Sequence, residues 1–306
     1  MLSAWLVACK AAGPAPATPT AGATPTEPPA AAVPTAPAVQ PGEVAARVNG
    51  QPILRQDFEM QVIRFEAAMV SQGMSFSGQE GAVNAQQVRK QVLESMIDEA
   101  LIAQAAAAEG ITVSPEVLQQ RIASEIQAGG GEAKFNQWLE TNHMTRQEYE
   151  AAMRSQIITD EIVRRLGTKI PETMKQVHIR QILVENEADA KSIRRQLDAG
   201  AKFDDLARKF SRDEATRDQG GDRGFLPLGT SILGPEIEKA LQGLQPGQIA
   251  GPIASPYGYY LIQLVEVDEN RALSPEQRQG LMRDAFVDWI EEQRSKAAIE
   301  RFVDVD

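Results

Sequence analysis

A proline-rich segment near the N-terminus constrains the fold of this chain more than any other feature. Residues 11–42 consist almost entirely of Ala, Pro, Thr and Gly, and they hold nine of the 18 prolines. Such a composition cannot bury enough apolar surface to offset the entropy lost on ordering, so we expect a disordered linker over residues 10–42. Proline-rich chains rise about 3.1 Å per residue, so the linker reaches up to roughly 100 Å. The folded part is therefore expected to begin near Glu43.

The bulk composition excludes several classes of function. The chain has 306 residues, with 42% hydrophobic and 24% charged, which is enough for two domains with their own cores. Its net charge of -11 repels phosphate backbones, so nucleic acid is not an expected partner. The sequence contains no run of about 20 apolar residues, so no transmembrane helix is predicted. With one cysteine and only His143 and His178, no disulfide or Cys/His zinc cluster can form, and neither a metal nor another cofactor is expected.

The first nine residues resemble the end of a bacterial lipoprotein signal. The lipobox of such signals has a Leu, a variable residue, a small residue and Cys, which here are Leu6, Val7, Ala8 and Cys9. A full signal also has a basic region and an apolar stretch of about 7–15 residues, so this interpretation requires a start further upstream. The resemblance implies that residues 1–9 are a signal remnant and that Cys9 carries the lipid of an extracytoplasmic, membrane-anchored protein. The alternative is a cytosolic protein with a chance Leu-x-Ala-Cys.

Residues 43–175 are predicted to form a helical domain. Short strands are expected at 44–48 and 51–54, on either side of an Asn-Gly turn. Apolar residues then recur at spacings of three and four, which predicts helices over 55–72 and 85–109 and helices starting at 115 and 145. These apolar stripes either pack into a core or line a cradle for unfolded polypeptide, and the pattern does not separate the two.

The C-terminal segment, residues 269–306, contains one further helix. Ser274-Pro275 is a typical helix start. Leu281, Ala285 and Trp289 then follow at spacings of four, which gives the helix a broad apolar face. We expect this face to pack on the helices of residues 43–170.

Between these segments, residues 176–268 have a different pattern. Strands are expected at 177–184, 247–253 and 259–267, and helices at 187–200, 203–210 and 236–242. The order β-α-α-α-β-β predicts helices wrapped on a small antiparallel sheet. Together with the helical segment, this places the whole chain in the α+β class.

A series of short motifs links this module to a known family. They are Arg180-Gln181-Ile182-Leu183-Val184, Phe203-Asp204-Asp205-Leu206-Ala207, Phe210-Ser211, Gly220-Gly221-Asp222-Arg223-Gly224-Phe225, Pro235-Glu236-Ile237, Leu244-Gln245-Pro246-Gly247, Gly251-Pro252-Ile253 and Tyr257-Gly258-Tyr259-Tyr260. In this order they resemble the parvulin (PpiC-type) peptidyl-prolyl isomerases. The stretches Val48–Ile53 and Leu93–Leu101 resemble the N-terminal chaperone region of the SurA and PrsA proteins.

The parvulin resemblance implies a reaction without a covalent step. Rotation about a peptide C–N bond faces a barrier of about 18–20 kcal/mol, and isomerisation at proline is slow without a catalyst. An enzyme needs only to bind the twisted amide more tightly than the planar one. The implied clients are unfolded or proline-containing polypeptides. No oligomeric state is predicted.

The resemblance also implies the site residues. Asp213 lies three residues after Phe210, where the family has a Cys or Asp, and Gln181 and Tyr260 stand where it has histidines. The proline pocket would be formed by Leu233, Ile237, Phe225 and Leu226, with Ser255 lining the site. The alternatives are an ordinary surface aspartate and plain core packing.

Departures from the family pattern leave two main hypotheses open. Gln and Tyr still form hydrogen bonds but do not titrate near neutrality as His does. Arg223 replaces a usual Leu, and Ile237 a usual Phe. Asp213 and the intact scaffold favour an extracytoplasmic isomerase, whereas the replaced residues favour a parvulin-fold chaperone that only binds unfolded polypeptide. A structural lipoprotein that scaffolds a partner is a third possibility.

Overall fold

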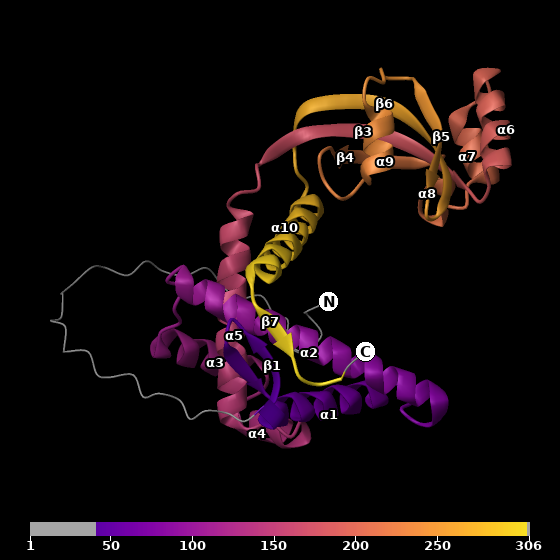
Figure 1. Ribbon diagram of the computed structural model, residues 1–306. Coiled ribbons are helices and arrows are strands. Elements are labelled where there is room, and N and C mark those ends of the chain that lie inside the picture. The colour runs from indigo at the N-terminus through magenta and orange to yellow at the C-terminus, as the bar shows by residue number, and fades with distance from the viewer. Residues whose placement is uncertain (1–40, 305–306) are drawn as a thin grey trace, which may run out of the picture. The chain divides into compact units, whose positions relative to one another are not determined.

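A computed structural model describes residues 41–304 of the chain, which form two compact units (Figure 1). The helical unit comprises the described residues up to Ile162 together with those from Trp289 onward, and the sheet unit comprises Val163–Asp288. Both boundaries fall inside helices, α5 (Arg146–Gly167) and α10 (Pro275–Lys296). The sequence-based boundaries at 175/176 and 268/269 stay predictions. Cys9 and the predictions for residues 1–40 lie outside the described residues.

The helical unit opens with a three-stranded antiparallel sheet in the order β2-β1-β7. β1 (Val44–Val48) and β2 (Gln51–Leu54) are the expected strands, joined by a turn in which Asn49 has a positive φ of 52°. The third strand, β7 (Ile299–Arg301), comes from the C-terminal end of the chain. The Asn49 side-chain oxygen accepts a 2.9 Å hydrogen bond from the Ala298 amide, so the turn itself holds the returning segment.

Five helices follow the first two strands. They are α1 (Arg55–Ser71), α2 (Gly78–Ala108), α3 (Pro115–Ala128), α4 (Glu132–Thr141) and α5. The expected start of α3 is confirmed, since the Ser114 hydroxyl accepts a bond from the Val117 amide. α4 was not expected from its pattern. It is held by tertiary contacts, because its Phe135 ring meets the Tyr149 ring edge-on at 4.8 Å and Leu139 is buried among apolar residues of α3 and α5.

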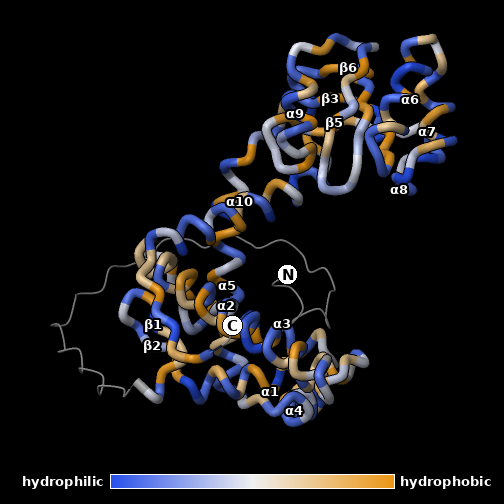
Figure 2. The backbone as a smooth tube through the Cα atoms, turned by 45° about the vertical axis from the view of Figure 1, so that its right-hand side comes forward, coloured by the Kyte–Doolittle hydropathy of each residue, from blue (hydrophilic) through white to orange (hydrophobic). Residues whose placement is uncertain are grey.

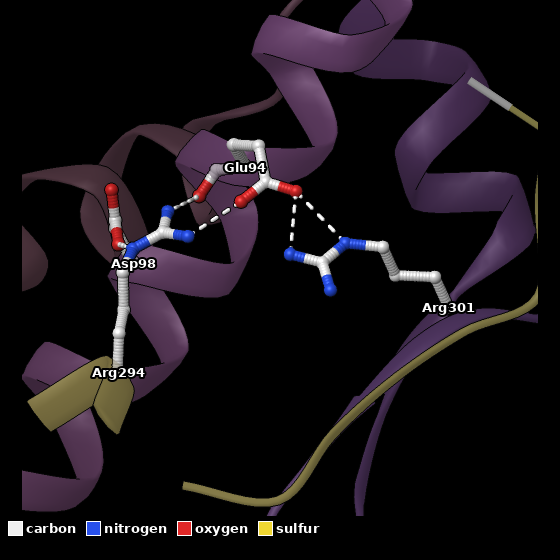
Figure 3. Close-up of polar contacts among 4 residues, drawn as sticks. All are labelled: Glu94, Asp98, Arg294 and Arg301. Carbon is white, nitrogen blue, oxygen red and sulfur yellow. Dashed lines mark hydrogen bonds and ion pairs between the residues drawn. The ribbon is translucent and has the colours of Figure 1, made fainter. Parts of the chain in front are cut away.

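The end of α10 is bound to α2 through a cluster of charges (Figure 3). The Arg294 guanidinium lies 2.5 Å from carboxylate oxygens of both Glu94 and Asp98. Arg301 contacts the Glu94 carboxylate at 2.8 Å. Burial acts to raise the pKa of Glu94, but the hydrogen bonds from the two arginines outweigh it and the pKa lies below its usual value. These four residues, which we term the C-terminal clip, join residues about 200 positions apart.

The sheet unit contains a four-stranded antiparallel sheet in the order β4-β3-β6-β5. The strands are β3 (Thr173–Val184), β4 (Asp222–Pro227), β5 (Ile249–Ser255) and β6 (Gly258–Ala272), and the helices are α6 (Glu187–Asp198), α7 (Phe203–Phe210), α8 (Glu214–Arg217) and α9 (Pro235–Leu241). Hydrophobic residues occur along the strands β3, β5 and β6 (Figure 2). The α+β class is confirmed. β4 and α8 are additions to the expected order.

Two apolar clusters lie on opposite faces of this sheet, since alternate strand residues point to opposite sides. One face packs Ile182, Val184 and Leu261 against α6 and α7. The other packs Val177, Ile179 and the β6 residues Ile262 and Leu264 with residues of the 226–244 segment, including α9. Among the described residues, no helix has both the length and the apolar character needed to cross a bilayer.

Candidate active site

The centre of the candidate site is the carboxylate of Asp213. Gln181 donates a 2.6 Å hydrogen bond from its side-chain amide to Asp213 Oδ2, and the Thr216 hydroxyl donates a short bond to the same oxygen. Gln181 is buried on β3, whereas Asp213 directly precedes the short helix α8 and Thr216 lies within it. The structure therefore brings two of the sequence-predicted residues into direct contact.

Local backbone bonds explain why the loop places Asp213 beside β3. The Arg212 amide donates to the Leu183 carbonyl at 2.8 Å, and the buried Ser211 hydroxyl accepts from the Leu183 amide at 3.2 Å. The same hydroxyl accepts from the Asp213 amide at 3.3 Å. The loop after α7 is thus fixed to β3 at Leu183, which lies two residues after Gln181.

Gly221 closes the loop on its other side. Its amide donates to the Thr216 carbonyl and its carbonyl accepts from the Gln181 amide, both at 2.8 Å. Its φ is +82°, and a Cβ at this position would lie 2.2 Å from the Gln181 carbonyl oxygen. Only glycine fits this conformation and this close approach. The Gly-Gly turn therefore sets the distance between the loop and the strand.

The electrostatics keep the Asp213 carboxylate ionised. Burial acts to raise its pKa, but the hydrogen bonds from Thr216 and Gln181 and the positive charge of Arg223 lower it more, so the pKa lies below the usual value. Burial and the negative charge of Asp213 raise the pKa of the Tyr260 phenol. At neutral pH the site thus contains an ionised carboxylate and a protonated phenol.

An apolar surface lies on the same face of the sheet as Tyr260. Leu226, Leu233 and Ile237 pack with Ile253 and Tyr260 in one cluster. Leu233 is buried, and the others are half-buried. Three of the four residues expected to line a proline pocket are therefore gathered next to one of the polar residues.

The remaining predicted residues lie apart from this group. The Phe225 ring is 5.2 Å from the His178 ring and carries the Arg271 guanidinium 3.7 Å from its centroid. Phe225 pairs with His178 across the strands, whereas Leu226 pairs with Val177, so Phe225 faces the other side of the sheet. Ser255 donates a 2.9 Å bond to the Gly258 carbonyl within the β5–β6 turn.

Sequence reasoning missed two polar partners. Thr216 is the first, and its hydroxyl donates to Asp213 Oδ2. The second is Asp222, which accepts bonds from His178 Nε2 and the Gly224 amide, both at 2.8 Å. No sequence spacing indicates the His178–Asp222 pair, because it forms between two strands that are 44 residues apart.

Comparison with known families agrees with this geometry. The family described as the SurA-like N-terminal domain matches residues 35–163, and the PPIC-type PPIase domain matches residues 172–266. The resemblances drawn from the motifs, to parvulins in the second half and to SurA and PrsA in the first, are thereby confirmed.

Individual relatives match over different lengths. A foldase protein PrsA from Caldanaerobacter subterraneus is 30% identical over 229 residues, which cover 72% of this chain and 73% of the relative. A chaperone SurA from Thiobacillus denitrificans is 35% identical over 156 residues, or 45% of this chain and 35% of the relative. The chain thus spans only about a third of the SurA chaperones that it matches.

A solved structure shares the fold. The peptidylprolyl isomerase PrsA from Bacillus anthracis superposes with a TM-score of 0.50 at 22% identity. The match covers 67% of this chain and 96% of that one. The arrangement of helices and strands is therefore one that a crystal structure also contains.

Proposed function

This chain belongs to the PrsA family of foldase proteins, and from that premise we propose that it is an extracytoplasmic peptidyl-prolyl cis-trans isomerase acting on X–Pro bonds of unfolded polypeptides. The observation that carries the proposal is the Asp213 carboxylate, held by Gln181 and Thr216 on the sheet face where Tyr260 and the apolar surface lie. The match of residues 172–266 to the PPIC-type PPIase family also supports this proposal.

The arrangement favours a twisted amide over a planar one. In a planar peptide bond, resonance places partial negative charge on the carbonyl oxygen, and twisting removes that resonance. A fixed, partly desolvated anion close to the carbonyl therefore raises the energy of the planar form more than that of the twisted form. Leu226, Leu233 and Ile237 provide an apolar contact for the proline ring. Gln181 and Thr216 position the carboxylate.

A proline-peptide assay tests this function. We expect the full chain to accelerate cis-to-trans isomerisation of an Ala-Pro tetrapeptide above the uncatalysed rate. Asp213→Ala should lower kcat/KM by about tenfold or more, which corresponds to about 1.4 kcal/mol of lost transition-state stabilisation. Arg212→Ala is the matched control, since Arg212 is the adjacent residue and pairs outward with Glu185 at 2.9 Å. If the rate with the unchanged chain equals the uncatalysed rate and Asp213→Ala does not change it, isomerase activity is excluded.

A second candidate function is binding of unfolded chains by the helical unit. The outer face of α1 carries an apolar stripe of Met60, Ile63, Ala67 and Val70, at spacings of three and four. Ile63 is 59% exposed and Val70 56%, and Met60 is also exposed. Methionine adapts to irregular apolar partners, as a site for many different clients requires. We propose that exposed apolar segments of unfolded clients bind this stripe.

An aggregation assay separates this second function from catalysis. The double variant Ile63→Ser with Val70→Ser should suppress aggregation of an unfolded client at least several-fold less well than the unchanged chain, while kcat/KM on the Ala-Pro peptide is retained. The control variant Gln56→Ser changes an exposed polar residue of the same helix. Equal suppression by all three proteins would count against the stripe.

We also propose a lipid anchor at Cys9, supported by the Leu6-Val7-Ala8-Cys9 motif and the proline-rich segment after it. A labelled fatty acid should be incorporated when the chain is expressed in bacteria behind a lipoprotein signal peptide. Label that persists in Cys9→Ala would contradict the anchor.

A further inference from the structure

Arg223 occupies an irregular point of β4, next to the candidate site. On the neighbouring strand, Asp222 pairs with Arg180 and Gly224 pairs with Ile179, so Arg223 is an extra residue with no partner on β3. Such bulges redirect a side chain out of the regular alternation, and they recur beside active sites. Arg223 lies two residues after Gly221, and Gly221 contacts Gln181.

In the part of the chain that the structure describes, the guanidinium of Arg223 differs from nearby arginines in forming no ion pair with a carboxylate. The surrounding arginines all have one: Arg180 contacts Asp222, Arg208 contacts Asp204, Arg212 contacts Glu185 and Arg217 contacts Asp218. Within residues 41–304, no ion pair or hydrogen bond engages the side chain of Arg223, which is exposed. Its five N–H donors are therefore available to a ligand.

The positive charge of Arg223 acts on the site from beside it. It contributes to lowering the pKa of Asp213, and it acts in the same direction on the Tyr260 phenol, where burial has the larger and opposite effect. Asp213 receives hydrogen bonds from Gln181 and Thr216, but it interacts with Arg223 only through charge. The guanidinium thus acts on Asp213 and Tyr260 through its charge and forms no hydrogen bond with either.

We propose that Arg223 is a specificity-determining residue that selects X–Pro bonds in which X is an acidic residue. This inference rests on the proposed isomerase function and names its substrate class. A guanidinium presents a planar fork of donors that matches a carboxylate, and it repels an ammonium group at the same place. A Glu side chain immediately before the proline places its carboxylate within a few ångströms of the bound amide, where a residue at the edge of the site can reach it.

Peptides that differ only at the residue before proline test the proposal. The substrates are tetrapeptides with Glu-Pro, Ala-Pro or Lys-Pro, and the quantity is kcat/KM for the full chain. We expect Glu-Pro to be preferred over Lys-Pro by roughly three- to tenfold at low salt, as fits one partly exposed charge pair. Arg223→Ala should bring this ratio close to one, and Arg223→Glu should invert it. Arg223→Lys should keep its direction.

The control variant is Arg217→Ala, which removes an arginine of the same loop that already pairs with its neighbour Asp218. It should leave the Glu-Pro to Lys-Pro ratio unchanged. The preference of the unchanged chain should also shrink as salt rises from about 0.01 to 0.15 M, since the Debye length falls from about 30 to 8 Å. A ratio near one that is the same in Arg223→Glu would overturn the proposal, while activity on Ala-Pro would leave the isomerase function standing.

If no peptide is isomerised, the proposed function fails and binding becomes the readout. Fluorescence polarisation of labelled, non-reacting Glu-Pro and Lys-Pro peptides then measures affinity directly. Tighter binding of the Glu-Pro peptide that Arg223→Ala removes would support the role of Arg223 in a binding site. Equal affinity of both peptides for the unchanged chain would refute it.

Discussion

At the scale of single residues, the polar centre of this site has no group that titrates near neutral pH. Gln181 has no ionisable proton in this range, and the pKa of Tyr260 is raised above its ordinary value of about 10. The pKa of Asp213 is lowered from an ordinary value near 3.9, so the carboxylate is charged throughout the physiological range. Where the parvulin resemblance implies histidines, Gln181 thus retains a hydrogen bond to Asp213 but brings no group that titrates near neutrality.

The first prediction concerns pH. Asp213 takes up a proton only below its usual pKa, and Tyr260 loses its proton only above about pH 10, so kcat/KM on Ala-Pro should be flat between about pH 5 and 9. Gln181→His should introduce a dependence with a midpoint near 6.5, the ordinary pKa of histidine. Rate measurements in buffers of constant ionic strength check this. A titration near pH 6–7 in the unchanged chain would mean that another group controls the rate.

The second prediction concerns the loop glycines. Gly221→Ala should destabilise the sheet unit by roughly 3 kcal/mol or more, because it adds a steric overlap with the Gln181 carbonyl to the cost of a left-handed conformation. Gly224→Ala is the matched control. Gly224 also has a positive φ, of 66°, but has open space around its Cβ position, so only about 1–2 kcal/mol is expected. Urea unfolding of both variants gives the comparison, and equal losses would show that contact with β3 is unimportant.

At the scale of elements, the helical unit depends on a buried arginine between α1 and the start of α5. The Arg64 side chain is only 8% exposed, and its guanidinium donates to the His143 carbonyl at 2.7 Å and to Glu148 at 2.8 Å. Glu148 also closes the expected capping box by accepting from the Thr145 amide at 2.7 Å. One carboxylate therefore both starts α5 and fixes it to α1.

The third prediction follows from this carboxylate. Hydrogen bonds from the Thr145 backbone, Arg64 and the Thr145 hydroxyl lower the pKa of Glu148 from 4.5 to about 2. A depressed carboxyl pKa contributes stability above the unfolded value, and that contribution is lost as pH falls from about 4.5 to 2. Arg64→Met should lower the free energy of unfolding by roughly 1–3 kcal/mol at pH 7. It should also make the loss of stability on acidification smaller, because Glu148 loses one of the bonds that lower its pKa. Urea unfolding at pH 7 and pH 3 measures both effects.

Arg89→Met is the control for the third prediction. Arg89 also pairs with a glutamate, Glu59 at 2.7 Å, but both side chains are about a third exposed. A pair so accessible to water contributes about 0–1 kcal/mol. A loss from Arg89→Met equal to that from Arg64→Met would show that burial does not determine the contribution.

At the scale of the whole molecule, each unit has its own core. The α3–α4–α5 cluster lies wholly in the helical unit, and both apolar clusters on the four-stranded sheet lie in the sheet unit. The chain enters the sheet unit through α5 and leaves it through α10. The C-terminal clip then holds the returning end against α2. Stability of the helical unit therefore depends on residues at the far end of the sequence.

The fourth prediction tests this dependence. Glu94→Gln leaves Arg294 and Arg301 without a charged partner at this position and should destabilise the helical unit by roughly 1–3 kcal/mol. Trp138 and Trp289, which both lie in this unit, report its unfolding by fluorescence. The value of kcat/KM on Ala-Pro at 25 °C should not change. Glu291→Gln, at an exposed site on α10, is the control, and an equal effect there would contradict the clip.

The sequence by itself determined the local features of this protein. The periodicities of α1, α2 and α6, the caps at Ser114 and Thr145, and the ordered motifs of the parvulin module depend on residues close together in the chain. The same motifs placed Asp213 and Gln181 in one site, and the structure joins them by a hydrogen bond. Such features follow from backbone preferences and side-chain spacing, which a short window of residues contains.

Only the tertiary structure decided the features that join distant segments. α4 has only ten residues and is held by the Tyr149 ring, and β7 is a three-residue strand that exists because β1 has an open edge. Phe225 faces His178 and not the apolar surface of the site, since the strand register fixes its side. Arg223 likewise acquires its place from a bulge that no local pattern predicts. In each case the position depends on pairing between strands or packing between helices far apart in sequence.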